Sequence, residues 1–125
     1  MRQVSIRNRT RPLTSPLVAD YCDQFLCKLR GLALRPKLAP DRGLVLADSS
    51  ESRVNAAIHM LGMAFDLSIV WLDSGLNVVD AQGARRWRSL LFPRQAARYV
   101  LEFHASRFEE FHIGDQLAFE DNLTP

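Results

Sequence analysis

The sequence predicts one mainly β domain over residues 1–125, a small antiparallel β-sandwich or barrel-like fold with two helices. Three observations support this fold class. Short segments of alternating apolar and polar residues recur along the chain between turn residues, which is typical of small all-β folds. A long amphipathic helical pattern occurs once, at about residues 20–31, and a short helix is expected near residues 106–111. A chain of 125 residues fits one domain that folds without a metal or a disulfide, and it leaves no room for a second, independent core.

The β pattern divides into short strands. We expect strands at residues 3–8, 17–19, 43–47, 55–61, 65–72, 77–82, 98–103 and 116–120. Residues 55–82 are expected to form a three-stranded meander, because consecutive strands joined by short turns usually pair antiparallel. A polar loop at residues 48–52, a long irregular loop at residues 83–94 and a loose tail at residues 121–125 complete the prediction.

The helix predicted at about residues 20–31 carries one apolar stripe, formed by Cys22, Phe25, Leu26 and Leu29. Asp20 is a suitable N-cap, and Gly31 is a natural residue just past the C-terminal end. In the second helix, Ser106 and Glu109 match a capping box. Local signals therefore agree for both helices.

The two cysteines, Cys22 and Cys27, both fall within the first predicted helix. Five residues of helix place them roughly 140° apart around the axis, so a disulfide would require unwinding. We therefore expect buried free thiols. The charged N-terminus is not followed by an apolar run, so no signal peptide is indicated and a cytoplasmic location is expected.

Charge is unevenly distributed, although the formal net charge is only +2. Residues 1–42 carry nine basic and three acidic side chains (+6), residues 43–101 six and five (+1), and residues 102–125 one and six (−5). The basic N-terminal part could be an anion-binding arm, or the two ends could meet in the fold and neutralise each other. No apolar run is long enough to span a membrane as a helix.

The order of several short motifs resembles a known family. The motifs are Gly31-Leu32, Gly43-Leu44, Ile58-His59-Met60, Phe65-Asp66-Leu67-Ser68-Ile69-Val70-Trp71-Leu72-Asp73, Val78-Val79, Tyr99-Val100-Leu101-Glu102 and Ile113-Gly114-Asp115. From about Val4 to Glu120 this succession resembles the bacterial and archaeal family called domain of unknown function 192. The resemblance implies a mainly β, sandwich-like fold with one flanking helix, and it implies no reaction.

Two departures from that family follow from the resemblance. Many family members look exported through a leader, which we do not expect for this chain. The family usually shows an aromatic residue, Met and then Lys or a small polar residue where this chain has His59-Met60-Leu61-Gly62. If those residues serve a ligand in the family, this chain would bind a different one.

One candidate site combines His59 with Asp66, joined by His104 or His112. A His–carboxylate pair can orient an imidazole for acid–base chemistry or contribute to a metal site. A metal site needs three or four converging ligands, however, and no spacing typical of such a site occurs. The same pair could be an ordinary cross-strand contact. No metal or cofactor is implied.

The loop at residues 83–94 is a second candidate. Its binding candidates are Arg85, Arg86, Trp87, Arg88 and Arg94. Arginines around a tryptophan suit contacts with phosphate and stacking with a base. The loop also holds Leu90, Leu91 and Phe92, so it could instead fold back over the core or present an exposed patch to a partner. A pI of 8.8 with an acidic C-terminus is not the footprint of a nucleic-acid-binding domain.

Two further sets of residues are weaker candidates. No nucleophile elbow or phosphate-binding loop surrounds a Ser or either Cys. Met60 and Met63 could offer thioethers to copper(I), although methionines in a β core usually fill gaps. The favoured function is therefore a non-enzymatic β domain that binds an unknown protein or a small anionic ligand through residues 83–94. The alternative is a metal-binding or hydrolytic domain centred on His59 and Asp66.

Overall fold

The structure is a computed structural model, which describes residues 2–24, 27–28, 31–32, 37–60, 63–87 and 90–122. Among them, seven strands form one sheet in the order β6-β5-β8-β3-β2-β1-β9, and β4 and β7 form a second, two-stranded sheet. The strands are β1 (Gln3–Asn8), β2 (Val18–Cys22), β3 (Arg42–Ser52), β4 (Ile58–His59), β5 (Leu67–Leu72), β6 (Val78–Ala84), β7 (Leu90–Leu91), β8 (Ala97–His104) and β9 (Leu117–Asp121).

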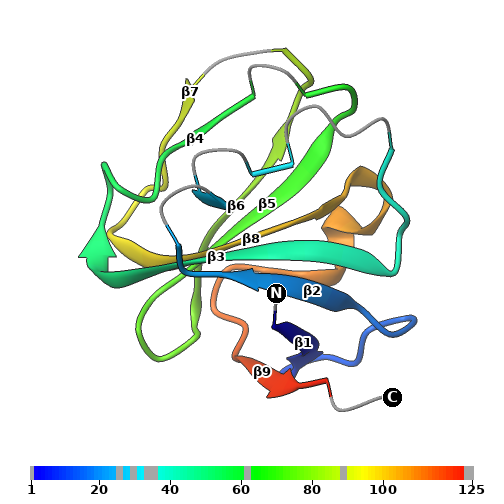
Figure 1. The fold of residues 1–125 in the computed structure, drawn as a ribbon. Coiled ribbons are helices and arrows are strands. Elements are labelled where there is room, and N and C mark those ends of the chain that lie inside the picture. Colours follow the sequence, from blue (N-terminus) through cyan, green and yellow to red (C-terminus); the bar gives the residue numbers. More distant parts are fainter. Residues whose placement is uncertain are drawn as a thin grey trace.

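The seven-stranded sheet curls into a half-barrel (Figure 1). All of its pairs are antiparallel except β2 with β3, which are parallel. In Figure 1, β4 and β7 lie above the centre of the sheet, whereas β1 and β9 curl beneath it. The predicted mainly β, barrel-like or sandwich-like class is confirmed, with one parallel pair in a largely antiparallel arrangement.

Both faces of the sheet are buried, and each supports its own core. Along β5, Ile69 and Trp71 belong to the core on the β4–β7 side, while Val70 and Leu72 belong to the core on the β1–β9 side. Alternate residues of a strand point to opposite faces, so a centre strand between two cores is apolar throughout. The buried indole of Trp71 donates its Nε1–H to the backbone carbonyl of Ala56, at 2.7 Å, and so satisfies its one polar atom.

The predicted meander at residues 55–82 is confirmed only in its last two strands. β5 and β6 pair antiparallel, and the Asp73 carboxylate accepts the backbone N–H groups of Gly75 and Asn77 in the turn between them. β4 does not pair with β5; it pairs with β7. The other edge of β5 is occupied by β8 over six residue pairs, so a long-range partner displaces the local one. The predicted loop at residues 48–52 is instead the exposed end of β3.

The helix predicted at about residues 20–31 is wrong at its start. Asp20 lies within β2, opposite Leu44 of β3 in the parallel pair, and is therefore no N-cap. Helical hydrogen bonds follow only later, from Lys28 N–H to the Gln24 carbonyl (3.1 Å) and from Gly31 N–H to the Cys27 carbonyl (2.9 Å). Residues 25, 26, 29 and 30 lie outside the described part of the chain. The free edge of β3 explains the difference, because it recruits residues 18–22 into the sheet.

The prediction of free thiols is also wrong, since Cys22 and Cys27 form a disulfide. Cys22 ends a strand and is not part of a helix, so the helical separation of the two side chains does not apply. The Cα atoms of Cys22 and Cys27 are 6.0 Å apart, within the range that a disulfide bridges. The bond ties the end of β2 to the helical turn that follows it.

The second predicted helix is confirmed as the 3-10 helix η1 (Ala105–Glu110). The predicted capping box is wrong, because the N-terminal cap is His104 and not Ser106: His104 Nδ1 accepts the Ser106 backbone N–H at 3.0 Å. The expected loose tail begins later than predicted, because Asp121 still belongs to β9. Residues 123–125 lie outside the described part of the chain.

The basic N-terminal part and the acidic C-terminal part lie side by side. β1 pairs with β9, Arg2 forms an ion pair with Asp121 (3.3 Å), and Arg11 forms one with Asp115 (2.9 Å). Of the two interpretations of the charge distribution, mutual neutralisation is the one that these contacts support. Among the residues that the structure describes, no helix is long and apolar enough to cross a membrane.

Candidate functional site

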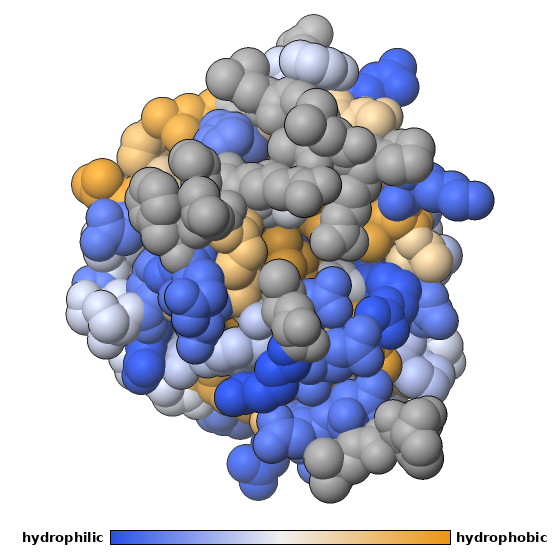
Figure 2. All heavy atoms as spheres, in the orientation of Figure 1, coloured by the Kyte–Doolittle hydropathy of each residue, from blue (hydrophilic) through white to orange (hydrophobic). Residues whose placement is uncertain are grey.

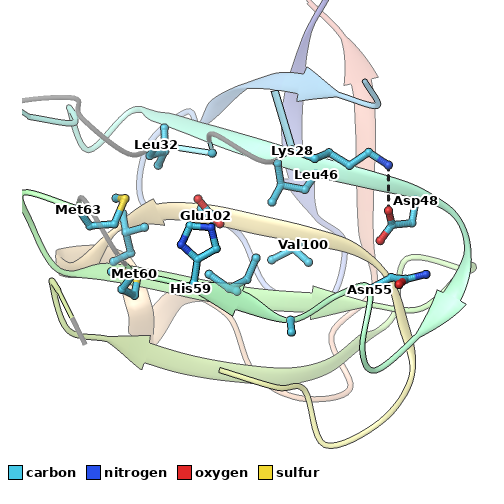
Figure 3. Close-up of a pocket in the computed structure, with 14 residues that line it drawn as sticks. Lys28, Leu32, Leu46, Asp48, Asn55, His59, Met60, Met63, Val100 and Glu102 are labelled. Carbon is cyan, nitrogen blue, oxygen red and sulfur yellow. Dashed lines mark hydrogen bonds and ion pairs between the residues drawn. The ribbon is translucent and has the colours of Figure 1, made fainter. Parts of the chain in front are cut away.

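A small pocket lies between the centre of the large sheet and β4 (Figure 3). Its walls are mainly apolar and include Leu32, Leu46, Ile58, Met60, Met63, Leu67 and Val100. Four ionisable side chains also line it: Lys28, Asp48, His59 and Glu102. The free space inside is about 70 Å³, which is enough for a few water molecules or one small ligand.

Glu102 is the most unusual residue of this pocket. It lies on β8 with Leu44 of β3 on one side and Ile69 of β5 on the other, and it is only 3% exposed. In Figure 3 its carboxyl group points into the pocket. Among the described residues, no side chain or backbone N–H makes a hydrogen bond or ion pair with this carboxyl group. Burial raises the pKa of Glu102 to about 7.

Gly31 brings the backbone close to that carboxyl group. Its φ is +54°, in the left-handed region that glycine adopts without strain. A Cβ atom at this position would lie 3.8 Å from Glu102 Oε1. The end of the helical turn therefore forms one wall of the chamber around the carboxylate.

The other ionisable groups lie nearer the rim. Lys28 Nζ forms an ion pair with Asp48 Oδ1 at 2.9 Å, and both side chains are partly exposed. His59, on β4, is exposed, and its imidazole projects into the same space as Glu102 in Figure 3. Because Lys28 is engaged by Asp48, it leaves the Glu102 carboxyl group without a counter-ion.

The structure does not bring the predicted histidine–carboxylate set together. Asp66 lines a different hollow, beside Arg85 and Phe108, and accepts the Arg86 backbone N–H at 2.8 Å. His104 caps η1, and His112 Nε2 lies 2.9 Å from the Glu109 carbonyl oxygen. No group of three or more His, Cys, Asp or Glu side chains that could hold a metal occurs among the residues described.

The segment 83–94 is a strand and turn more than an irregular loop, because it contains the end of β6 and all of β7. Its exposed apolar side chains form what we call the tryptophan patch: Trp87 (62% exposed), Leu90 (56%) and Phe92 (42%). Figure 2 shows apolar surface at the upper left, where β7 lies in Figure 1. These three side chains therefore do not fold back over the core, which was one of the two alternatives for this segment.

The arginines of this segment differ in their surroundings. Arg85 and Arg86 are exposed, and neither forms an ion pair with another described residue. Arg94 lies 3.6 Å from the carboxylate of Asp80, which also accepts its backbone N–H. Arg88 lies outside the described part of the chain. Among the described arginines of the segment, Arg85 and Arg86 are therefore the ones without an ion pair to another described residue.

Glu102 is not among the site residues predicted from the sequence, although a signal for it exists. Residues 98–103 alternate, so Val100 and Glu102 lie on the side of the strand opposite Tyr99, Leu101 and Phe103. That opposite side looks solvent-facing only if the sheet has one core. Val100 is buried against the second core, and Glu102 is buried with it. A charged residue on a strand that is apolar on both faces is the recognisable sign.

The fold matches known structures closely. A protein from Sinorhizobium meliloti 1021, described as a candidate transcription regulator, has the same fold, with a TM-score of 0.82 at 19% identity over 94% of this chain and 92% of the other. A protein of unknown function from Novosphingobium aromaticivorans superposes with a TM-score of 0.73 at 16% identity, over 93% of this chain and 83% of the other. At these identities the likeness shows the fold alone.

Sequence relatives are found among archaeal proteins named UPF0127. The protein from Thermococcus gammatolerans is 41% identical over 83 residues, which cover 66% of this chain and 52% of the relative. The protein from Thermococcus sibiricus is 36% identical over 100 residues, covering 78% and 63%. The match thus spans roughly half to two thirds of these relatives. The profile of the family DUF192, described as "Uncharacterized ACR", matches residues 6–119, and the chain therefore belongs to the DUF192 family.

Proposed function

We propose that this protein is a non-enzymatic binding domain, and that residues 83–94 dock an acidic segment of a partner protein. The observation that carries the proposal is the exposure of Trp87, at 62%, together with Leu90 and Phe92. Large apolar side chains that are exposed within one short segment are typical of a contact surface. Tryptophan and arginine are also the residues most enriched at the energetic centres of protein interfaces.

The backbone of Trp87 supports the same proposal. Its φ is +60°, a left-handed conformation that costs a non-glycine residue about 1–2 kcal/mol. The Trp87 backbone N–H donates to the Met60 carbonyl at 3.2 Å, which holds the turn in place. A strained residue that directs a large ring outward is consistent with a role in binding.

An acidic partner is favoured by charge. Arg85 and Arg86 directly precede Trp87, and neither forms an ion pair with another described side chain. Opposite charges across an interface increase the association rate and select among partners. Arg2 and Arg11, by contrast, already have acidic partners within the fold.

The alternative function, a metal-binding or hydrolytic domain centred on His59 and Asp66, has less support. These two residues line different hollows, so a shared site would require a rearrangement. For the compartment, the Cys22–Cys27 disulfide favours an oxidising environment over the cytoplasmic location expected from sequence. Disulfides are rare in cytosolic proteins, apart from those of hyperthermophiles.

The two tryptophans allow a direct test, because Trp71 is fully buried and Trp87 is exposed. The probe is a short peptide in which Glu alternates with Phe, titrated at low salt while tryptophan emission is followed. We expect a shift of Trp87 emission to shorter wavelength that weakens as salt rises. The double variant R85A/R86A should weaken binding, and R7A, an exposed arginine on β1, should not.

Three parallel titrations decide between partners. The same peptide with Lys in place of Glu should not bind. If inorganic pyrophosphate binds and the acidic peptide does not, the partner is a small anion and not a protein. If only a mixed oligonucleotide binds, the partner is a nucleic acid. If no probe changes the emission of the wild-type protein at low salt, the proposed function is wrong.

A further inference from the structure

We propose that the pocket around Glu102 is a binding site for a small primary ammonium ligand carried on a short apolar chain. This site is separate from the tryptophan patch, and it goes beyond the function proposed for residues 83–94. Its residues come from β8, β4, β3 and the helical turn that contains Lys28.

The Glu102 carboxyl group is the feature that indicates a ligand. Nine-tenths or more of buried polar groups in folded proteins have a hydrogen-bond partner. Glu102 is 3% exposed, points into the pocket, and has no partner among the described residues. An ionised carboxylate accepts hydrogen bonds at several lone pairs and donates none, so a partner for the ionised form of Glu102 must be a donor. A cationic donor also supplies the charge that a buried carboxylate lacks.

The walls of the pocket define the rest of the ligand. Met60, Met63, Leu46 and Val100 surround the carboxyl group with apolar surface. An ammonium group on an alkyl chain matches a charged end followed by apolar walls, and the flexible thioethers of methionine adapt to such chains. A free space of about 70 Å³ favours a short chain, of about two to four carbons.

None of the other described charged groups that face the pocket is as well placed as Glu102 to bind an ammonium group. Lys28, from the helical turn, forms its ion pair with Asp48 of β3. Asp48 is thereby neutralised, and it lies at the end of the pocket away from Met63 in Figure 3. His59, from β4, is exposed and its imidazole faces the same space as Glu102, but the two side chains form no hydrogen bond or ion pair in the described part of the chain.

The experiment is isothermal titration calorimetry of the full chain with a series of n-alkylammonium chlorides, from methyl to hexyl. Alcohols of the same length serve as neutral isosteres. We expect binding that is strongest at about two to four carbons. The alcohols should bind about tenfold more weakly or not at all, since they lack the charge-assisted hydrogen bond.

Two variants assign the binding to Glu102. E102Q keeps the shape of the side chain and should lower the affinity about tenfold or more. Near-ultraviolet circular dichroism confirms that E102Q is folded. E120Q, at an exposed glutamate on β9, is the matched control and should bind as the wild type does.

The dependence on pH provides an independent readout. The affinity for propylammonium should rise between pH 6 and pH 8 as Glu102 ionises, and binding should release a proton, measured by repeating the titration in buffers of different ionisation enthalpy. Because His59 also faces the pocket, the H59Q variant is measured in parallel and should keep the same rise.

Any of three results would overturn the proposal. The folded wild type could fail to bind alkylammonium ions at millimolar concentration, or E102Q could bind them as tightly as the wild type does. The third result is binding of copper(I) or zinc without binding of any ammonium ion. W87A should bind propylammonium normally. The failure of this site is therefore distinguishable from failure of the partner surface at residues 83–94.

Discussion

Two regions of this protein bury charged side chains, and the regions differ in whether those side chains have hydrogen-bond partners. Near β1 and η1, the Arg107 guanidinium donates to the carbonyls of Ser15, Pro16 and Pro40 and to the Glu110 carboxylate, at 2.6–3.2 Å. On the other face of the sheet, Glu102 is buried equally well and has no partner among the described residues. A buried charge with every hydrogen bond satisfied stabilises the fold, whereas one without partners costs stability and is available to a ligand.

Asp115 belongs to the satisfied group. It accepts hydrogen bonds from the side chains of Arg11 and Asn8 and from the His112 backbone N–H, at 2.9–3.1 Å. Burial raises the pKa of Asp115, but these hydrogen bonds outweigh it and hold the pKa below its ordinary value. At Glu102 the same burial acts alone, so the pKa rises. The presence or absence of donors therefore decides the direction of each shift.

Removing Arg107 should have the largest effect on stability. The R107M variant keeps an apolar stem but leaves Glu110 and three carbonyl groups without their donor. Breaking a buried ion pair from one side costs about 3–5 kcal/mol of unfolding free energy. Urea denaturation measures the change, and R7A, on the exposed side of β1, should stay within about 0.5 kcal/mol of wild type. A loss below about 1 kcal/mol for R107M would remove the contrast between the two regions.

Replacing Glu102 should do the opposite and stabilise the protein at high pH. Between about pH 4.5 and pH 7, the unfolded chain has lost the Glu102 proton while the folded chain keeps it. The stability of the ligand-free wild type therefore falls as pH rises through this window, by about 3 kcal/mol in total. The E102Q variant should lack this fall and be the more stable protein at pH 8, with little difference at pH 4. Parallel stability curves for the two proteins would contradict the assignment of Glu102 as a buried, unpaired acid.

The disulfide should contribute less, and mainly to the Glu102 side. Closing the short loop between Cys22 and Cys27 stabilises by about 2 kcal/mol in the chain-entropy treatment. The C22S/C27S variant should therefore melt at lower temperature than the oxidised wild type and match the wild type in reductant. Since Lys28 and Gly31 of the pocket follow the bond, we also expect weaker propylammonium binding, while the Arg107 network is unaffected. Equal melting temperatures with and without reductant would show that the bond constrains nothing.

The smallest expected effect is at Trp87. Glycine adopts a φ of +60° without strain, although it loses more backbone entropy on folding. The W87G variant should gain about 0.5 kcal/mol in unfolding free energy while losing the interaction with the acidic peptide. Chemical denaturation and the peptide titration, done with W87F as the control, separate the two effects. A large loss of stability in W87G would show that the ring contributes to folding and not to binding.

Much of the fold is predictable from the sequence, because alternation identifies strands such as β1, β8 and β9 and because η1 has local helix signals. The pairing of strands that lie far apart in the sequence cannot be predicted in this way. Nothing local tells that β5 pairs with β8 and leaves β4 to β7, or that Asp20 enters a parallel strand beside β3. The disulfide was missed for the same reason, since it depends on where β2 ends.

The candidate sites were predictable to a smaller degree. Arginine and tryptophan content singles out Arg85, Arg86 and Trp87, but only the structure reports that Trp87 is exposed. The sequence predicts a pair of His59 and Asp66. In the structure, the acidic residues that share the pocket with His59 are Glu102 and Asp48. A pocket that joins residues 28, 59 and 102 depends on tertiary packing, which periodicity does not encode.

The most direct test of the central claim is the titration of Glu102 itself, followed by NMR of its side-chain carboxyl carbon. In the ligand-free protein we expect a pKa of about 7, since burial raises it and no described partner lowers it. Saturation with propylammonium should lower that pKa markedly, because a bound cation favours the carboxylate. A pKa in the ordinary range for glutamate, or a raised pKa that propylammonium does not change, would contradict a carboxylate held ready for a cationic ligand.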